Sequence, residues 1–299
     1  MDRIVTTDPE GALRRRLSDF ITRSSPWHHS VNALLKKVRA HKWKVFVFGG
    51  ALRDLVTISP TVAPRDLDLV VAGATSEDLQ AAFATELIRV NRFGGLNLLI
   101  HKLPVDIWTL ESTWAFRHGR VSGGDFMDLP KTTFLNVEAI AAELDTQPGR
   151  ARQVYGRTFF RSIQERLLEI NLEENPFPGL CVVRSLVIAR KLNFAIGPRL
   201  IRFIAHHGSR MDVEEFEAMQ LTHYGRIRIN RPELQQALRT VREKSRSVKL
   251  RPVELPKAKQ LDWDFGRWPY STESQTLQLD WHSRWWEHQS FANDHSSSQ

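Results

Sequence analysis

Three aspartates are notable because each lies in a short apolar run of the kind that forms β-strands. Asp66 and Asp68 alternate with apolar residues in the run 66–71, and Asp106 lies in a second run, 104–108. Residues two apart on a strand project from the same face, so the first two carboxylates are expected side by side. Such neighbours repel each other unless a cation lies between them. The alternative is an edge strand with one solvated face, but the third acid favours an oxygen-ligand site for Mg²⁺, or for Mn²⁺ in its place.

Two glycines precede these acids in a setting that suits an anion. Gly49 and Gly50 end the apolar run 44–48 and open a segment expected to be helical, which carries Arg53 and Asp54. The first backbone N–H groups of a helix have no partner within it, and glycine allows a phosphate to approach them. A glycine pair is also common in ordinary turns. The predicted anion site therefore depends on the acids that follow.

Together, these features predict phosphoryl chemistry. Three carboxylates on neighbouring strands, beside a phosphate-binding turn, would hold two metal ions about 3.5–4 Å apart. One ion would activate a hydroxyl group, and the other would neutralise the pyrophosphate that leaves.

Two motifs in this part of the chain resemble the signature of a known superfamily. Residues 49–54 read Gly-Gly-Ala-Leu-Arg-Asp, and residues 65–68 read Arg-Asp-Leu-Asp. The pair resembles the DNA polymerase β-like nucleotidyltransferases, and within them the class II tRNA CCA-adding enzymes and bacterial poly(A) polymerases. Residues 183–186 and 191–194 look like the neck helix of that branch. The likeness covers roughly residues 30–205.

The resemblance implies a role for each candidate site residue. Asp66 and Asp68 would bind the two metal ions, and Asp106 would act as a base or a third ligand. Gly49 and Gly50 would hold the triphosphate of an NTP substrate. The remaining nucleotide-binding residues that the resemblance implies are Arg53, Asp54, Asn136 and Arg184.

The chain also departs from that branch in ways that bear on the reaction. Class II enzymes carry Arg-Arg-Asp-Phe-Thr-x-Asn after the catalytic strands, whereas the stretch 130–136 keeps Asn136 but has Thr132 where the aspartate belongs. Cys181 and Val187 stand where the neck helix usually has arginine. The group that reads the base edge has no clear counterpart. These differences argue against faithful C-C-A synthesis. They fit an enzyme that transfers nucleotides but follows a different rule for which nucleotides it adds.

We therefore expect an enzyme that transfers NMP from an NTP to the 3′ hydroxyl of an RNA, with tRNA as one candidate acceptor, and releases pyrophosphate. Two alternatives stay open at this point. One is a catalytically silent relative that binds RNA or tRNA, and the other is a nucleotidyltransferase that acts on a protein or a small molecule.

The hydrophobic pattern predicts an α+β fold, with a polymerase β-like head built on a small mixed sheet and an all-α neck and body after it. Strands are expected at 44–48, 67–71, 97–101 and 105–110, and helices near 30 and 76 and at 152–170, 180–192, 200–205, 213–219 and 233–241. The predicted domains are an N-terminal helical extension (1–29), the catalytic domain (30–146), a basic helical neck and RNA-binding domain (147–260) and a Trp-rich C-terminal segment with a partly disordered tail (261–299).

Composition narrows the class of protein and of partner. The 299 residues are 41% hydrophobic and 25% charged, a balance typical of a soluble globular chain. The stretch 147–260 holds 22 basic and 11 acidic side chains, so its net charge of +11 exceeds the +8 of the whole chain and favours a polyanionic partner such as RNA. No apolar run of 18 residues or signal peptide is apparent, so we expect a cytoplasmic protein without a membrane partner. The single cysteine excludes a disulfide framework.

Overall fold

The computed structural model describes residues 8–22, 27–57, 64–147 and 149–256. The chain forms two compact units, the first extending to Asn175 and the second beginning at Pro176. In these described ranges, no helix combines the length and the apolar character that a membrane crossing requires.

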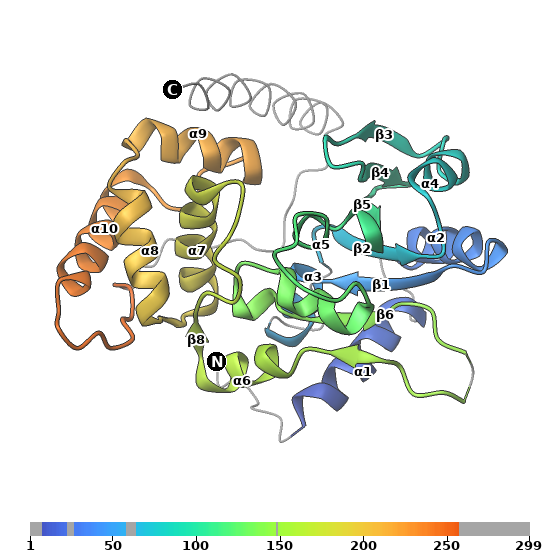
Figure 1. Cartoon of the computed structure of the whole chain (residues 1–299), viewed down its shortest axis with the longest axis horizontal. Helices are drawn as coiled ribbons and strands as arrows, with labels where there is room; N and C mark the ends of the chain where they lie inside the picture. The colour runs from blue at the N-terminus through green and yellow to red at the C-terminus, as the bar shows by residue number, and fades with distance from the viewer. Residues whose placement is uncertain (1–7, 23–26, 58–63, 148, 257–299) are drawn as a thin grey trace. The chain divides into compact units, whose positions relative to one another are not determined.

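A seven-stranded sheet forms the centre of the first unit, with the strand order β3-β4-β5-β2-β1-β6-β7 (Figure 1). β2 and β5 run parallel, and all other neighbours in this sheet are antiparallel. The strands are β1 (Lys44–Phe48), β2 (Leu67–Ala72), β3 (Leu87–Val90), β4 (Leu96–Ile100), β5 (Leu103–Thr109), β6 (Ala141–Glu143) and β7 (Val154–Tyr155). Parallel neighbours cannot be joined by a tight turn, so the chain between β2 and β5 passes through a helix and two strands.

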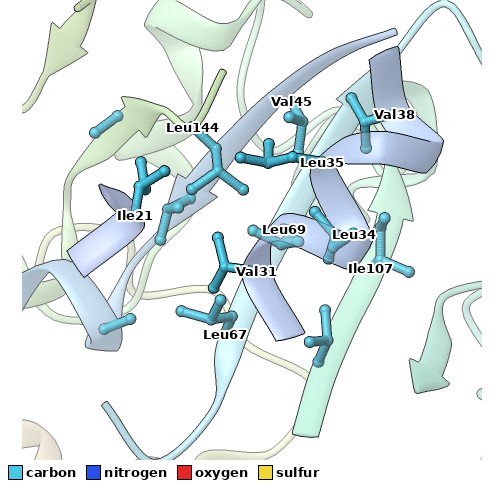
Figure 2. Packing of buried hydrophobic residues seen from close by; sticks show 14 of the residues in the cluster. Ile21, Val31, Leu34, Leu35, Val38, Val45, Leu67, Leu69, Ile107 and Leu144 are labelled. Carbon is cyan, nitrogen blue, oxygen red and sulfur yellow. The ribbon is translucent and has the colours of Figure 1, made fainter. Parts of the chain in front are cut away.

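Two N-terminal helices cover one face of this sheet. α1 (Pro9–Thr22) and α2 (His28–Ala40) carry apolar residues at helical spacing, so each presents one stripe to the core. Figure 2 shows the α2 stripe facing apolar side chains of the central strands. The residues labelled in that view come from α1 (Ile21), from α2 (Val31, Leu34, Leu35 and Val38), from the strands (Val45, Leu67, Leu69 and Ile107) and from the position after β6 (Leu144).

The opposite face of the sheet carries a smaller apolar cluster. Phe46 and Val70 pack there against Phe126 and Leu129, and all four are buried. Further elements of the first unit are α3 (Gly50–Thr57), α4 (Ser76–Ala82), α5 (Trp114–Arg117), α6 (Arg157–Glu165), β8 (Leu167–Leu168) and the 3₁₀ helices η1 (Leu110–Ser112), η2 (Phe126–Thr132) and η3 (Asn136–Glu138). The polar part of this face is not covered by the cluster, and it holds the candidate site.

The second unit is mainly helical. It contains α7 (Pro178–Leu192), β9 (Ala195–Ile196), α8 (Pro198–Gly208), α9 (Val213–Tyr224) and α10 (Arg231–Ser245). Asp212 and Asn230 cap α9 and α10 through reciprocal capping boxes. Glu233 in the first turn of α10 also pairs with Arg190 of α7 at 2.8 Å, which ties these two helices together.

The predicted fold class is confirmed, but a helix predicted at 152–170 is wrong. That stretch forms β7, α6 and β8. Gly156 ends the strand at a place where an added Cβ would lie 2.9 Å from Ile140, and Arg166 ends α6 in the left-handed conformation, with φ of 53°. β3, β6 and β7 were not predicted, because strands this short carry too few residues to show a period of two.

The compact units divide the chain at a different place from the predicted domain boundaries at 29 and 146, which stay a prediction. Apolar side chains of α1 and α2 belong to the same core as the sheet. The stretch after 146 likewise contributes β7, which pairs with β6, and Phe159, which is fully buried in that core. The sheet unit therefore continues to Asn175. The predicted Trp-rich segment, 261–299, lies outside the described residues.

Candidate active site

The register of the central strands places two of the three aspartates side by side. Asp68 on β2 pairs with Asp106 on β5 in the parallel ladder, and Asp68 also pairs with Phe48 on β1. Residues paired in this way share a face of the sheet. The apolar neighbours Leu67 and Leu69 are buried on the other face, so the alternation along β2 separates the acids from the core.

Asp66 comes directly before β2 and forms an ion pair with the preceding residue, Arg65. Arg65 donates from Nη2 to Asp66 Oδ2 at 2.5 Å and from Nε to the same oxygen at 3.0 Å. Both side chains are 41% exposed. Because the pair is open to solvent, it contributes little to stability, and its two partners can separate at low cost.

Asp106 differs from Asp66 in its surroundings. Asn97 on β4 donates from Nδ2 to Asp106 Oδ1, and Arg89 on β3 donates from Nε to Asn97 Oδ1 at 2.8 Å. Although solvent reaches the Asp106 side chain, protein atoms crowd it closely, and this desolvation raises the pKa of Asp106 to about 6. The hydrogen bond from Asn97 lowers the pKa, and the negative charge of Asp66 raises it.

The glycine turn follows the strand next to Asp68. Gly49 has φ of +70°, a left-handed conformation that favours glycine, and its N–H donates to Ile140 O at 3.0 Å. Gly50 begins α3, and a Cβ added there would meet Arg53 only at ordinary contact distance, from 3.5 Å. Within the protein, therefore, glycine is required at 49 and not at 50. The small residue at 50 leaves the start of α3 accessible to a ligand.

Arg53 and Asp54 lie beneath this turn and form a buried ion cluster. Arg53 Nε donates to Asp54 Oδ1 at 2.9 Å, and Arg53 Nη1 donates to Glu138 Oε1 at 2.7 Å. The Arg53 and Glu138 side chains are each 8% exposed. The cluster joins α3 to η3, so Arg53 and Asp54 hold the helix start in place. A direct contact of either residue with a nucleotide stays a prediction.

The two other predicted nucleotide-binding residues have different surroundings. Asn136 is buried, its Nδ2 donates to Leu167 O at 3.0 Å, and its Oδ1 accepts from the N–H of Glu169 at 2.9 Å. Both ends of this amide therefore join η3 to the chain near β8. Arg184 is half-buried on α7 in the second unit. A nucleotide contact by either residue stays a prediction.

The role of the three acids as metal ligands stays a prediction. Among the described residues, no group of three or more histidine, cysteine, aspartate or glutamate side chains is arranged to hold a metal ion. Two of the three carboxylates accept hydrogen bonds from protein donors, Asp66 from Arg65 and Asp106 from Asn97.

The donors around Asp106 were missed by sequence reasoning. Asn97 was predicted to lie in a strand, and it is the only polar residue of β4. A single polar residue in an otherwise apolar strand was the signal that could have indicated a polar partner. Arg89 carried no signal, since β3 itself was not predicted.

Comparison with known proteins identifies the fold. The sequence matches no protein-family model and no curated protein. The structure resembles a CCA-adding enzyme solved in complex with ATP, with a TM-score of 0.54 and 17% identity over 90% of this chain and 68% of that one. It also resembles a CCA-adding enzyme solved with CTP, with a TM-score of 0.53 and 17% identity over 77% of this chain and 53% of that one. The chain thus spans about half to two thirds of these structures. The predicted polymerase β-like nucleotidyltransferase resemblance is confirmed at the level of the fold.

Proposed function

We propose that this chain is a nucleotidyltransferase that moves NMP from an NTP to the 3′ hydroxyl of an RNA. The observation that carries the proposal is the register around Asp68, which pairs with Asp106 on one side and with Phe48 on the other. Gly49 follows Phe48 directly, so the acids and the glycine turn meet in one region of the sheet. Acids beside a phosphate-binding turn are what phosphoryl transfer requires.

The chain's own groups would divide the reaction between them. The triphosphate would lie against the N-terminus of α3, where backbone N–H groups attract anions and Gly50 leaves room. Asp106 would accept the proton of the attacking hydroxyl at Oδ2, because Asn97 already donates to Oδ1. The hydroxyl oxygen would then bond to the α-phosphorus while the bond to the bridging oxygen breaks, and pyrophosphate would leave.

Asp66 and Asp68 are the residues that would hold a divalent cation, Mg²⁺ or Mn²⁺. The available donors are all carboxylate oxygens, which these ions prefer. Three carboxylates in one region also concentrate negative charge, as the effect of Asp66 on the pKa of Asp106 indicates. When bound, the metal would stabilise charge on the phosphate oxygens. Arg65 would first release Asp66, which the exposure of that pair permits.

The second unit would bind the acceptor. Six basic side chains between 239 and 251 are exposed, and Glu243 is the only acid in that stretch. Such a surface attracts nucleic-acid phosphates in a salt-dependent way. The CCA-adding enzymes of similar fold were solved with ATP and CTP, which supports an NTP as the substrate of this chain. As the acceptor, tRNA is one RNA to test. Thr132 stands where class II enzymes have an aspartate, and the group that reads the base edge has no clear counterpart. Both differences favour the addition of nucleotides in a pattern other than C-C-A.

The test is incorporation of labelled nucleotide. The full chain is incubated with Mg²⁺, each α-labelled NTP in turn, and either tRNA or total RNA, and the products are separated on a gel. The Asp68→Asn variant should lose incorporation by about 10³-fold or more, as expected for a group within the catalytic unit. The matched control is Glu77→Gln, an exposed carboxylate in the first turn of α4, which should behave as wild type.

Other outcomes would contradict the proposal and identify the alternative. RNA binding without incorporation of any NTP would indicate a catalytically silent relative. Label transferred to a protein or to a small molecule would place the chemistry on a different acceptor. Full activity in Asp68→Asn would exclude this site as the catalytic centre.

A further inference from the structure

A row of hydrogen-bonded side chains crosses three strands and ends at Asp106. Arg89 on β3 opposes Asn97 on β4, and Asn97 opposes Asp106 on β5. Arg89 Nε donates to Asn97 Oδ1 at 2.8 Å, and Asn97 Nδ2 donates to Asp106 Oδ1. The neighbours of Asn97 along β4, Leu96 and Leu98, are buried on the other face. The row is therefore a polar track on the same face as the candidate site.

An irregularity in β3 places Arg89 in this row. Leu87 pairs with Leu98, but the next pair is Arg89 with Asn97, so β3 advances two residues while β4 advances one. In a regular ladder Ile88 would oppose Asn97. The bulge displaces Ile88, which is 42% exposed, and turns Arg89 to the face of the acids. β-Bulges commonly redirect a side chain next to a functional site.

The donor and acceptor types in the row fix the orientation of the amide. Arginine offers only donors, so Asn97 must present its oxygen to Arg89 and its NH₂ group to Asp106. The NH₂ group in turn holds Oδ1 of Asp106 and favours the carboxylate, which can accept this bond. An amide free to flip would instead offer its oxygen to the carboxylate, which would repel it.

We infer that Asn97 and Arg89 are positioning residues for Asp106 in the proposed nucleotide transfer. Asn97 fixes the rotamer of Asp106 and leaves Oδ2 for the attacking hydroxyl, and Arg89 acts through Asn97 by preventing the amide flip. The inference rests on the proposed function for its catalytic meaning, but the hydrogen-bonded row itself is testable without activity.

The kinetic test uses near-isosteric variants. Asn97→Asp keeps the shape of the side chain but removes both N–H donors, so kcat should fall by about 10–100-fold, the usual cost of losing a group that orients a catalytic ligand. The KM values for NTP and RNA should not change, because Asn97 does not bind either substrate. Matched controls are Asn32→Asp on α2 and Arg120→Met, which are both exposed. Equal kcat in Asn97→Asp and wild type would overturn the inference.

The role of Arg89 is tested by coupling. Arg89→Met should lower kcat, and Arg89→Lys should restore part of it, since lysine keeps one donor and the charge. In an Asn97→Leu background, Arg89→Met should have a much smaller effect, because only the direct charge effect of Arg89 on Asp106 then remains. Additive losses in the double variant would show that Arg89 acts by itself and would contradict this part of the inference.

An NMR experiment separates failure of this inference from failure of the proposed function. With ¹⁵N-labelled asparagine, the Asn97 side-chain amide is assigned by its loss in Asn97→Leu. One of its N–H resonances should lie downfield and exchange slowly in wild type, and Asp106→Ala or Arg89→Met should shift it. If wild type incorporates no nucleotide but these shifts occur, the row exists and the proposed function is wrong. If the chemical shift of this resonance is the same in wild type and in both variants, the positioning role is wrong, whether or not the protein incorporates nucleotide.

Discussion

The chain contains two Arg-Asp dipeptides at its candidate site, and their surroundings are opposite. Arg53 and Asp54 are buried, with side chains 8% and 17% exposed, and Glu138 adds a second carboxylate to the arginine. Arg65 and Asp66 form an equally direct ion pair, but each side chain is 41% exposed. The same two residue types thus provide a fixed internal support in one place and a separable pair in the other. Burial decides which role the dipeptide takes.

The largest stability effect is expected where the ion cluster is buried. Arg53→Met leaves Asp54 and Glu138 without their shared cation in a low-dielectric environment. Breaking a buried ion pair on one side costs about 3–5 kcal/mol of the free energy of unfolding. Urea denaturation followed by circular dichroism measures this loss. A cost near zero would show that solvent reaches the cluster and would remove the contrast with Arg65.

A smaller effect distinguishes the two glycines beside that cluster. Gly49→Ala forces a Cβ into the left-handed region and should cost about 1–2 kcal/mol. Gly50→Ala meets only ordinary contacts and should leave the unfolding free energy nearly unchanged while it lowers nucleotide incorporation. Denaturation and the incorporation assay, applied to both variants, separate the structural glycine from the ligand-binding one. Unchanged activity in Gly50→Ala would contradict close approach of a phosphate there.

Asp106, the proposed proton acceptor, should lower the free energy of unfolding when it is ionised. Desolvation first, and then the charge of Asp66, raise the pKa of Asp106 from 3.8 to about 6. Between pH 4 and pH 6 the native state then binds more protons than the unfolded state, so wild-type stability falls as the pH rises through this range. In EDTA, Asp106→Asn should melt at a slightly higher Tm than wild type. The difference should widen from pH 4 to pH 6 and stay constant above; a pH-independent difference would point to another cause.

The smallest effect is expected for the exposed dipeptide. Arg65→Met should change the free energy of unfolding by about 0–1 kcal/mol, because both charges remain hydrated without each other. The same denaturation assay used for Arg53→Met provides the direct comparison. A loss as large as that of Arg53→Met would show that the two pairs are equivalent and that Asp66 is not readily released.

The sequence indicated the strands that carry Asp68 and Asp106, because the apolar runs that form β2 and β5 are a local property of the chain. It also indicated the glycine turn, since Gly49 and Gly50 follow a strand directly. Register between distant strands is not local, and so the pairing of Asp68 with Asp106 could not be predicted. The pairing of Asn97 with Asp106 is local, because β4 and β5 form a hairpin closed by His101 and Lys102, but it was not considered. The bulge that places Arg89 in the row likewise depends on β3 and β4 together. The hydrogen-bond donors Arg65 and Asn97, which contact Asp66 and Asp106, were not considered as partners of the acids.

The parallel pairing of β2 with β5 has a consequence for how the protein matures. Its two acids belong to strands separated by an entire crossover, and such long-range contacts close late during folding because their entropic cost must be met first. A nascent or partly denatured chain that has formed its helices and hairpins therefore lacks the paired acids of the candidate site. Recovery of the proposed nucleotide incorporation after denaturation should follow the slowest structural phase and not the earlier return of helical signal.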